Sequence, residues 1–158
     1  MASQQGDLSL LDSPIAQALL HSTNPARLAY VWPGGTPRVV PIWFHWTGKE
    51  VVLGTPSAAP KIKALRRNPK VALTIDSADY RVLLIRGTAR IELMDGVVPE
   101  YAMAARRYMG EEEGNAWLQQ ASTLMKKMAR IAIEPEWVGT LDFQTRFPSA
   151  IEAAMAGA

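Results

Sequence analysis

Residues 55–70, Thr-Pro-Ser-Ala-Ala-Pro-Lys-Ile-Lys-Ala-Leu-Arg-Arg-Asn-Pro-Lys, are the most informative stretch of the chain. The second proline suits the first turn of a helix and the Asn-Pro pair ends it, so the sequence predicts a short helix over 60–68. The last ten residues of the stretch hold five cationic side chains and no acidic one. Lys61 and Lys63 fall in the first helical turn, where the helix dipole disfavours cations unless an anion lies there.

A phosphate group is the anion that this stretch predicts. Thr55 and Ser57 precede the helix, and their hydroxyls suit phosphate oxygens. The alternative is a solvated basic face behind an ordinary helix start, because basic runs are commonly just solvated. The position of Lys61 and Lys63 in the first turn favours the phosphate.

Short strands joined by turns surround the basic helix. The sequence predicts strands over 27–32, 38–46 and 51–53 as two successive hairpins, strands over 71–75 and 82–93, a strand pair over 130–143, and helices from 14 to about 24, over 98–109 and over 111–127. Small Gly87 and Ala89 leave space for a close neighbour. Together these elements predict one domain, 1–158, of α+β (mainly β) class: an antiparallel barrel of six to seven strands, closed or nearly closed, with flanking helices.

The strand over 38–46 is the second informative feature, because both of its faces are apolar. Pro41 has no N–H for the ladder, so strand pairing is expected to be interrupted there. Val40, Pro41, Ile42 and Trp43 offer an apolar wall with free backbone groups, which suits a flat heteroaromatic ring such as a flavin. The alternative is an edge strand that packs its aromatics into the core or a subunit interface, and composition alone favours that alternative.

Composition excludes several classes of function. The chain has no cysteine and two histidines, so thiolate chemistry and the usual zinc or iron centres are not expected, and no metal site is predicted. A net charge of +2 does not indicate nucleic-acid or membrane binding, although a pI near 9.0 allows a local basic patch. With no apolar run of 18 residues and no export signal, a cytoplasmic protein is expected.

The remaining candidate residues carry weaker signals. His45 lies in an apolar strand without an acidic partner, which favours a core or interface histidine over a catalytic base. His21 ends a helix, where a cation suits the dipole. The run 111–113 of three glutamates is the acidic first turn of a helix. Nothing in the pattern indicates a protein nucleophile, so redox chemistry requires a borrowed cofactor.

The order of these features resembles the pyridoxine 5′-phosphate oxidase-like flavin-binding split-barrel family, especially its small bacterial flavin- and deazaflavin-dependent branch. The resemblance covers roughly residues 10–145. Its most specific parts are Leu-Arg-Arg-Asn-Pro at 65–69, Arg-Gly-Thr-Ala-Arg at 86–90 and Ile-Glu-Pro at 133–135. It implies a homodimer of six-stranded split barrels with FMN, or the deazaflavin coenzyme F-420 in some members, at the subunit interface.

The resemblance also implies roles for individual residues. The isoalloxazine ring would lie along Val40, Pro41, Ile42 and Trp43, the ribityl chain or phosphate near Thr55 and Ser57, and the phosphate itself on Lys61 and Lys63, while Arg38 aligns with a cofactor-contacting arginine. Trp43 stands where the oxidases usually have a lysine, and their terminal Arg-Leu-x-Pro is missing. Pyridoxamine phosphate oxidation is therefore not expected. Arg146 is a candidate to reach across the dimer.

The expected function is thus an FMN-dependent oxidoreductase that transfers hydride between the bound flavin and a small planar substrate. A deazaflavin-dependent reductase is an alternative, in which Arg66, Arg67 and Lys70 either serve the acidic tail of that cofactor or are solvated charges. Flavin- or haem-binding proteins without turnover are further alternatives, although neither histidine is a convincing haem ligand.

Overall fold

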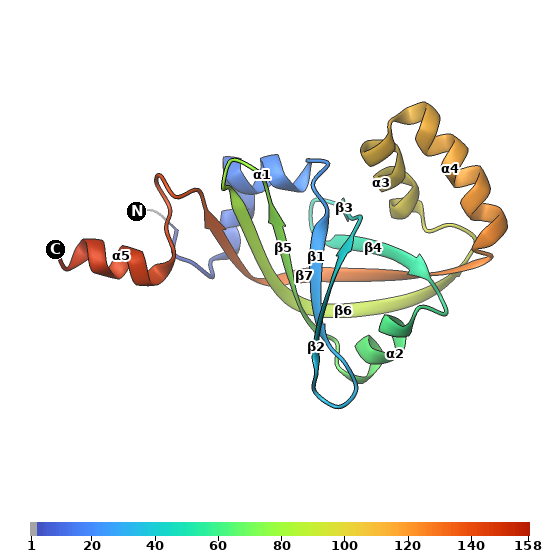
Figure 1. Cartoon of the computed structure of the whole chain (residues 1–158), viewed down its shortest axis with the longest axis horizontal. Helices are drawn as coiled ribbons and strands as arrows, with labels where there is room; N and C mark the ends of the chain where they lie inside the picture. The colour runs from blue at the N-terminus through green and yellow to red at the C-terminus, as the bar shows by residue number, and fades with distance from the viewer. Residues whose placement is uncertain (1–2) are drawn as a thin grey trace.

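The computed structural model describes residues 3–158 and shows one antiparallel sheet flanked by helices (Figure 1). The sheet contains seven strands in the order β2-β1-β5-β6-β7-β4-β3. The strands are β1 Ala26–Val31, β2 Pro37–Ile42, β3 His45–Trp46, β4 Val51–Pro56, β5 Lys70–Asp76, β6 Val82–Asp95 and β7 Lys127–Leu141; the helices are η1 Leu8–Asp12 (3-10), α1 Pro14–Leu20, α2 Pro60–Arg67, α3 Pro99–Met109, α4 Glu111–Leu124 and α5 Ser149–Ala156. The predicted α+β class and antiparallel barrel are confirmed.

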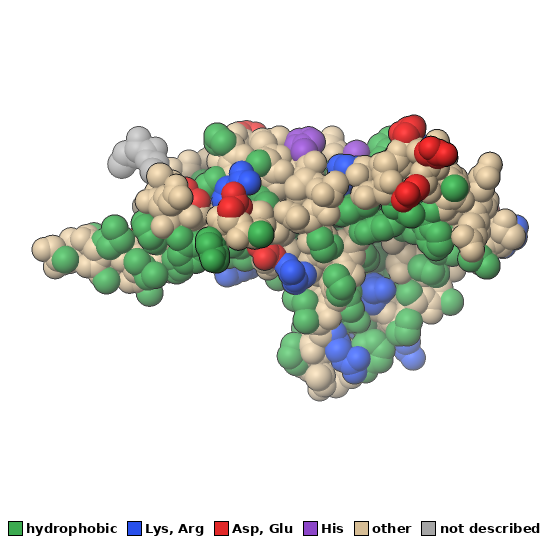
Figure 2. All heavy atoms as spheres, turned by 45° about the horizontal axis from the view of Figure 1, so that its top comes forward, with side chains coloured by type: hydrophobic (Ala, Val, Ile, Leu, Met, Phe, Trp, Pro, Cys, Tyr) green, Lys and Arg blue, Asp and Glu red, His purple; other side chains and the backbone are tan. Residues whose placement is uncertain are grey.

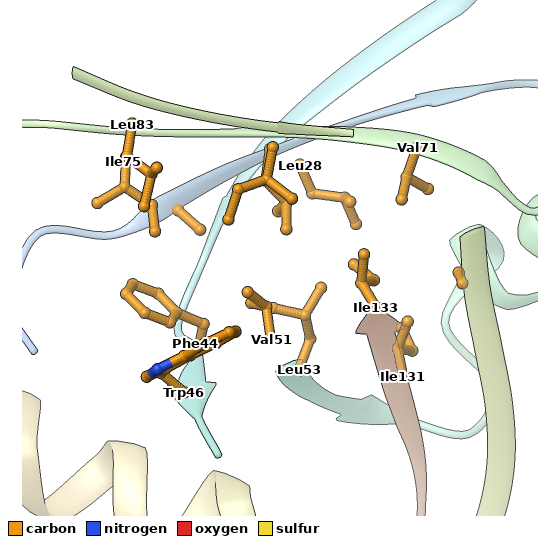
Figure 3. Packing of buried hydrophobic residues seen from close by; sticks show 14 of the residues in the cluster. Leu28, Phe44, Trp46, Val51, Leu53, Val71, Ile75, Leu83, Ile131 and Ile133 are labelled. Atoms are coloured by element: carbon orange, nitrogen blue, oxygen red, sulfur yellow. The ribbon is translucent and has the colours of Figure 1, made fainter. Parts of the chain in front are cut away.

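The core lies inside the curled sheet, where its two halves face each other (Figure 3). Leu28, Val71, Ile75 and Leu83 come from β1, β5 and β6. Across from them lie side chains of β3, β4 and β7 and of the residue before β3, namely Phe44, Trp46, Val51, Leu53, Ile131 and Ile133. Burying these aliphatic and aromatic side chains removes apolar surface from water, which is the main force that holds the barrel together.

The predicted strand over 38–46 is in fact two strands at opposite edges of the sheet. β2 pairs with β1 at one edge, and β3 pairs with β4 at the other. Trp43 and Phe44 connect them, so this short segment closes the barrel covalently, and the two predicted hairpins do not form one continuous meander. The expected interruption at Pro41 is wrong: the ladder passes through Pro41, opposite Arg27, because an edge strand tolerates a residue without an N–H.

β6 and β7 are the longest strands and pair along almost their whole length. The strand pair predicted over 130–143 is therefore one continuous strand, which begins at Lys127, where the predicted helix over 111–127 has already ended. A register shift lies beside Gly87, and a Cβ there would be 2.5 Å from the backbone oxygen of Glu134. The close neighbour expected at Gly87 is thus the β7 backbone.

The helices pack outside the barrel, and their ends follow local sequence signals. Ser13 caps α1 by accepting a hydrogen bond from the Ala16 N–H, and Pro60 opens α2. α3 and α4 form a hairpin inserted between β6 and β7, with Gly110 at φ 85° between the two helices. α5 projects from the barrel at the carboxyl end, and none of its residues is buried (Figure 1). No helix within residues 3–158 is long and apolar enough to cross a membrane.

Candidate functional site

A hollow of about 580 Å³ lies between α2 and the turn that joins β1 to β2. Its lining comes from three segments: Trp32 and Pro33 of the turn, residues 57–60 before α2, and the α2 side chains Ile62, Lys63, Arg66 and Arg67. The turn is tight because Gly34 and Gly35 adopt left-handed φ angles of 105° and 94°. Ser57, predicted as a phosphate ligand, therefore shares this hollow with Lys63.

Basic side chains gather at this end of the molecule, where α2 and the β1–β2 turn lie, with no acidic side chain among them on the face shown (Figure 2). α2 carries Lys61, Lys63, Arg66 and Arg67, and none of the four forms a salt bridge with any residue in 3–158. No side chain caps the helix N-terminus, since Ala59 occupies the N-cap. The cations and the open helix end therefore both favour a bound anion.

Lys61 lies apart from the other α2 cations. Residues two apart in a helix point about 200° from one another, so Lys61 and Lys63 occupy opposite faces of α2. The Lys61 ammonium is half-buried and donates a hydrogen bond of 3.4 Å to the hydroxyl of Thr55, which is itself buried. Burial lowers the pKa of Lys61, because desolvation disfavours the charged ammonium. The predicted phosphate ligands are thus two pairs, Thr55 with Lys61 and Ser57 with Lys63.

Trp32 is a site residue that the sequence analysis missed. It lines the hollow, and the Arg38 guanidinium stacks over its ring at 4.5 Å from the centroid. A second hollow of about 420 Å³ shares Trp32, Pro33 and Arg67 with the first and extends to Asn68. Arg38 is exposed and reaches both hollows only through Trp32. The available signal was the predicted hairpin of 27–32 and 38–46, because Trp32 and Arg38 both adjoin its turn; the structure pairs Tyr30 with Arg38.

The predicted ring-binding residues lie on β2 and just beyond it. Val40 and Ile42 are half-buried and pack against the core, whereas Val39 and Pro41 face outward, with Val39 65% exposed. One face of this strand is therefore open. β2 is one edge strand of the sheet, and β4 lies next to β3, the other edge strand. The candidate residues on 38–43 and those on 55–57 therefore come from opposite ends of the strand order.

Trp43 is half-buried and stacks on a helix that the sequence did not connect with it. Its ring is parallel to that of Tyr108 within 9°, with 5.1 Å between the centroids, and Tyr101 lies 6.1 Å away. Both tyrosines are on α3, seven residues apart and hence on one helix face. Nothing in the pattern of the predicted helix 98–109 identified its partner.

The other candidate residues serve the barrel rather than the hollow. Arg146 bonds within its own chain, to the backbone oxygens of Ser3 at 2.9 Å and Thr140 at 3.3 Å. The Lys70 ammonium lies beside Glu136 and Thr88. It is therefore not placed to bind the acidic tail of a deazaflavin, the role considered for it. His45 is half-buried, and burial together with nearby Arg107 lowers its pKa.

Comparisons with known proteins agree on one family. The model of the pyridoxamine 5′-phosphate oxidase family matches residues 14–142. Among solved structures, an F420 reductase is 25% identical with a TM-score of 0.64 and covers 78% of this chain and 94% of its own. A putative pyridoxamine 5′-phosphate oxidase from Listeria innocua is 25% identical with a TM-score of 0.58 and covers 80% and 94%.

More distant structures share the fold alone. The haem storage protein HutZ from Vibrio cholerae is 18% identical, with a TM-score of 0.61 and coverage of 82% of this chain and 93% of its own. No curated protein sequence matches the chain. The match to the family model spans most of the barrel, including the basic helix, the 86–90 strand and the end of β7. The chain therefore belongs to the pyridoxamine 5′-phosphate oxidase family.

Proposed function

We propose that the protein is an FMN-dependent oxidoreductase, acting as a homodimer on a small planar substrate. The observation that carries this proposal is the group of four α2 cations that form no salt bridge within residues 3–158. Three of them, Lys63, Arg66 and Arg67, line a hollow whose wall includes Trp32. Clustered cations repel one another and destabilise the free protein unless an anion joins them. A phosphate monoester carries the charge and the acceptor oxygens that fit them.

Each part of the site has its own task in this proposal. The phosphate lies at the open N-terminus of α2, where Ser57 and Lys63 contact it from one side and Thr55 and Lys61 from the other. The open face and backbone of β2 offer the apolar wall and polar groups that a flat ring requires. A bound flavin supplies the hydride chemistry, so the protein needs no nucleophile of its own.

The proposed dimer rests on a second surface. A hollow of about 400 Å³ beside β1, β5 and β6 is lined mostly by apolar residues, together with Lys70, Arg86 and Glu136. Val39 and Pro41 of the edge strand β2 are exposed on their outward face. A second copy would bury this apolar surface and cover the open strand.

The proposal is tested by titrating the apo-protein with FMN while absorbance and flavin fluorescence are followed. The Lys61→Ala/Lys63→Ala variant should bind FMN at least tenfold more weakly, since charge-assisted phosphate contacts contribute about 1.5–3 kcal/mol each. The matched control is Lys49→Ala/Arg81→Ala, which removes two cations that already have carboxylate partners. Absence of FMN binding, or equal losses in both variants, would refute the proposal.

A deazaflavin cofactor is the second candidate, favoured by one observation. The two hollows share Trp32, Pro33 and Arg67, so a ligand that extends beyond its phosphate has further space beside Arg67. A parallel titration with coenzyme F-420 separates the two cofactors. Steady-state turnover with the reduced cofactor then separates an enzyme from a carrier. No histidine lines either hollow, which favours a flavin over haem.

A further inference from the structure

The aromatic cluster of Trp43, Tyr101 and Tyr108 joins the β2–β3 connection to the inserted helix α3. The Trp43 and Tyr108 rings are nearly parallel, with centroids 5.1 Å apart. Phe44, fully buried beneath them, meets Tyr108 edge-on at 6.4 Å and 76°. Offset stacking and edge-to-face contacts are the preferred aromatic geometries, so the cluster fixes the orientation of the indole.

Tyr108 is itself anchored at several points. Its hydroxyl donates a hydrogen bond of 3.0 Å to the backbone oxygen of Asn24, before β1. The neighbouring Arg107 donates to the backbone oxygen of Ser22 at 3.0 Å and to that of Phe44. The carboxyl end of α3 thus binds the backbone next to Trp43 as well as its ring. A side chain held on both sides in this way is preorganised.

The amino end of α3 is held equally firmly. Glu100 accepts two hydrogen bonds from Arg130 of β7, at 2.6 and 2.9 Å. Tyr101 crosses Gly54 of β4 so closely that a Cβ there would lie 2.7 Å from the Tyr101 Cβ. The indole of Trp117 on α4 donates to the Tyr101 hydroxyl at 2.9 Å. These contacts therefore hold the α3–α4 hairpin against the barrel in one defined orientation.

We infer that Tyr108 is a positioning residue that holds Trp43 as a flat wall for an uncharged aromatic or quinoid substrate. The inference rests on the proposed function, in which the flavin ring lies along β2, and Trp43 directly follows the last residue of that strand. Tyr108 covers one face of the indole by stacking, and Trp43 remains partly exposed. An indole edge or face offers no charge and favours flat π systems. Arg107 is already engaged by two carbonyls, so it is not free to select an anionic substrate.

The test compares Tyr108→Leu, Tyr108→Phe and the matched control Tyr80→Leu, which changes an exposed tyrosine in the β5–β6 turn. Each FMN-loaded protein is photoreduced and mixed in a stopped-flow instrument with 2-methyl-1,4-naphthoquinone or with ferricyanide. Taking a hydride from the reduced flavin and a proton from water, the quinone becomes the hydroquinone. Ferricyanide accepts single electrons and is not planar, so it does not require the wall.

Tyr108→Leu should raise the quinone concentration for half-saturation at least fivefold, with a limiting rate and a ferricyanide rate within twofold of wild type. Tyr108→Phe, which keeps the ring but loses the bond to Asn24, should shift half-saturation two- to threefold. Tyr80→Leu should match wild type. Unchanged quinone saturation in Tyr108→Leu, or equal losses with both oxidants, would overturn the inference.

A readout without flavin keeps the two proposals separate. The indole N–H signal of Trp43, assigned by its loss in Trp43→Phe, should be sharp in wild-type apo-protein and broadened or shifted in Tyr108→Leu. An unchanged signal contradicts the positioning role, whatever the cofactor. If wild-type protein binds no FMN, the proposed function fails, whereas wild-type FMN binding with unaltered quinone selectivity in Tyr108→Leu refutes only the role of Tyr108.

Discussion

Lys61 and Lys63 are two residues apart on α2 and act on opposite sides of it: Lys61 donates to Thr55 within the protein, whereas Lys63 lines the hollow. A half-buried ammonium without a carboxylate partner costs folding free energy, because the desolvation of its charge is not offset. Such a residue is explained more readily by binding than by stability. The two lysines should therefore respond differently to substitution.

Lys61→Met should stabilise the apo-protein and weaken FMN binding. The thioether keeps most of the side-chain volume and removes the desolvated charge, so a gain of about 1 kcal/mol is expected, or about 2–4 °C in Tm. Because the unfolded state binds more protons between the lowered pKa of folded Lys61 and its ordinary value of 10.5, wild-type stability should rise with pH in that interval. Scanning calorimetry against pH checks both effects; a destabilised Lys61→Met with normal FMN affinity would assign Lys61 to the fold.

FMN affinity should fall at alkaline pH in wild type but not in Lys61→Arg. Burial lowers the pKa of Lys61, so its positive charge is lost as pH rises through that value, below the usual 10.5. Arginine stays protonated throughout this range. Titrations from pH 7 to 10 measure the difference, and parallel curves for the two proteins would mean that Lys61 does not contact the phosphate.

Arg38→Lys should weaken FMN binding about two- to fivefold. The substitution keeps the charge but loses the planar guanidinium that stacks on Trp32 at 4.5 Å, a contact of about 0.5–1 kcal/mol at an exposed site. Arg27→Lys is the control, because Arg27 is an exposed strand residue paired with Asp76. Equal FMN affinity in Arg38→Lys and Arg27→Lys would mean that the stacking of Arg38 on Trp32 does not contribute to FMN binding.

Glu100→Gln should destabilise the protein by about 1.5–3 kcal/mol at pH 7, since it ends a charge-assisted bond pair to Arg130. The hydrogen bonds from Arg130 lower the pKa of Glu100, so its contribution is complete above the unfolded value of 4.5 and is lost as pH falls through the lower folded value. Urea unfolding from pH 7 to 3 should show the two stabilities converging in acid. A constant difference would assign the effect to packing.

Gly87→Ala should cost about 1–3 kcal/mol, because the new methyl group would lie 2.5 Å from the Glu134 backbone oxygen and force β6 from β7. Gly157→Ala adds the same methyl group where the nearest atom is 3.5 Å away and should change stability by less than about 0.5 kcal/mol. Thermal unfolding of both variants provides the comparison, and similar values would show that the β6–β7 contact adjusts.

Elements whose ends are marked by local chemistry were predicted closely from the sequence. The cap at Ser13 and the prolines at the start of α1 and α2 depend on nearest neighbours alone. The break at Trp43 and Phe44 was not predicted, because apolar residues continue through 39–44 on both faces of the expected strand and only the closure of the barrel divides the segment between two edges. β7 was predicted as two strands because its sequence does not show that a single partner, β6, pairs with it along almost its whole length.

The site was predicted in part for a similar reason. The cations of α2 and the hydroxyls before it are close in sequence, so their composition identified them. Trp32 and Arg38 meet across a hairpin, and Trp43 meets Tyr108 across 65 positions of the chain. Such contacts between distant segments are set by tertiary packing, which leaves no periodic signal in the sequence.

The attachment of the α3–α4 hairpin has a consequence for how this protein can diversify. Asp95 and Lys127, the last residue of β6 and the first of β7, are direct partners in the ladder and also form a 3.7 Å ion pair. The segment from Gly96 to Lys126 therefore leaves the sheet and returns to it at one pair of bonded residues, so another segment could replace it without a change in strand pairing. A tight Asn-Gly turn can bridge the same two ends, since adjacent antiparallel strands need only two linking residues. Grafting other hairpins at this rung offers a way to vary substrate choice on a constant scaffold.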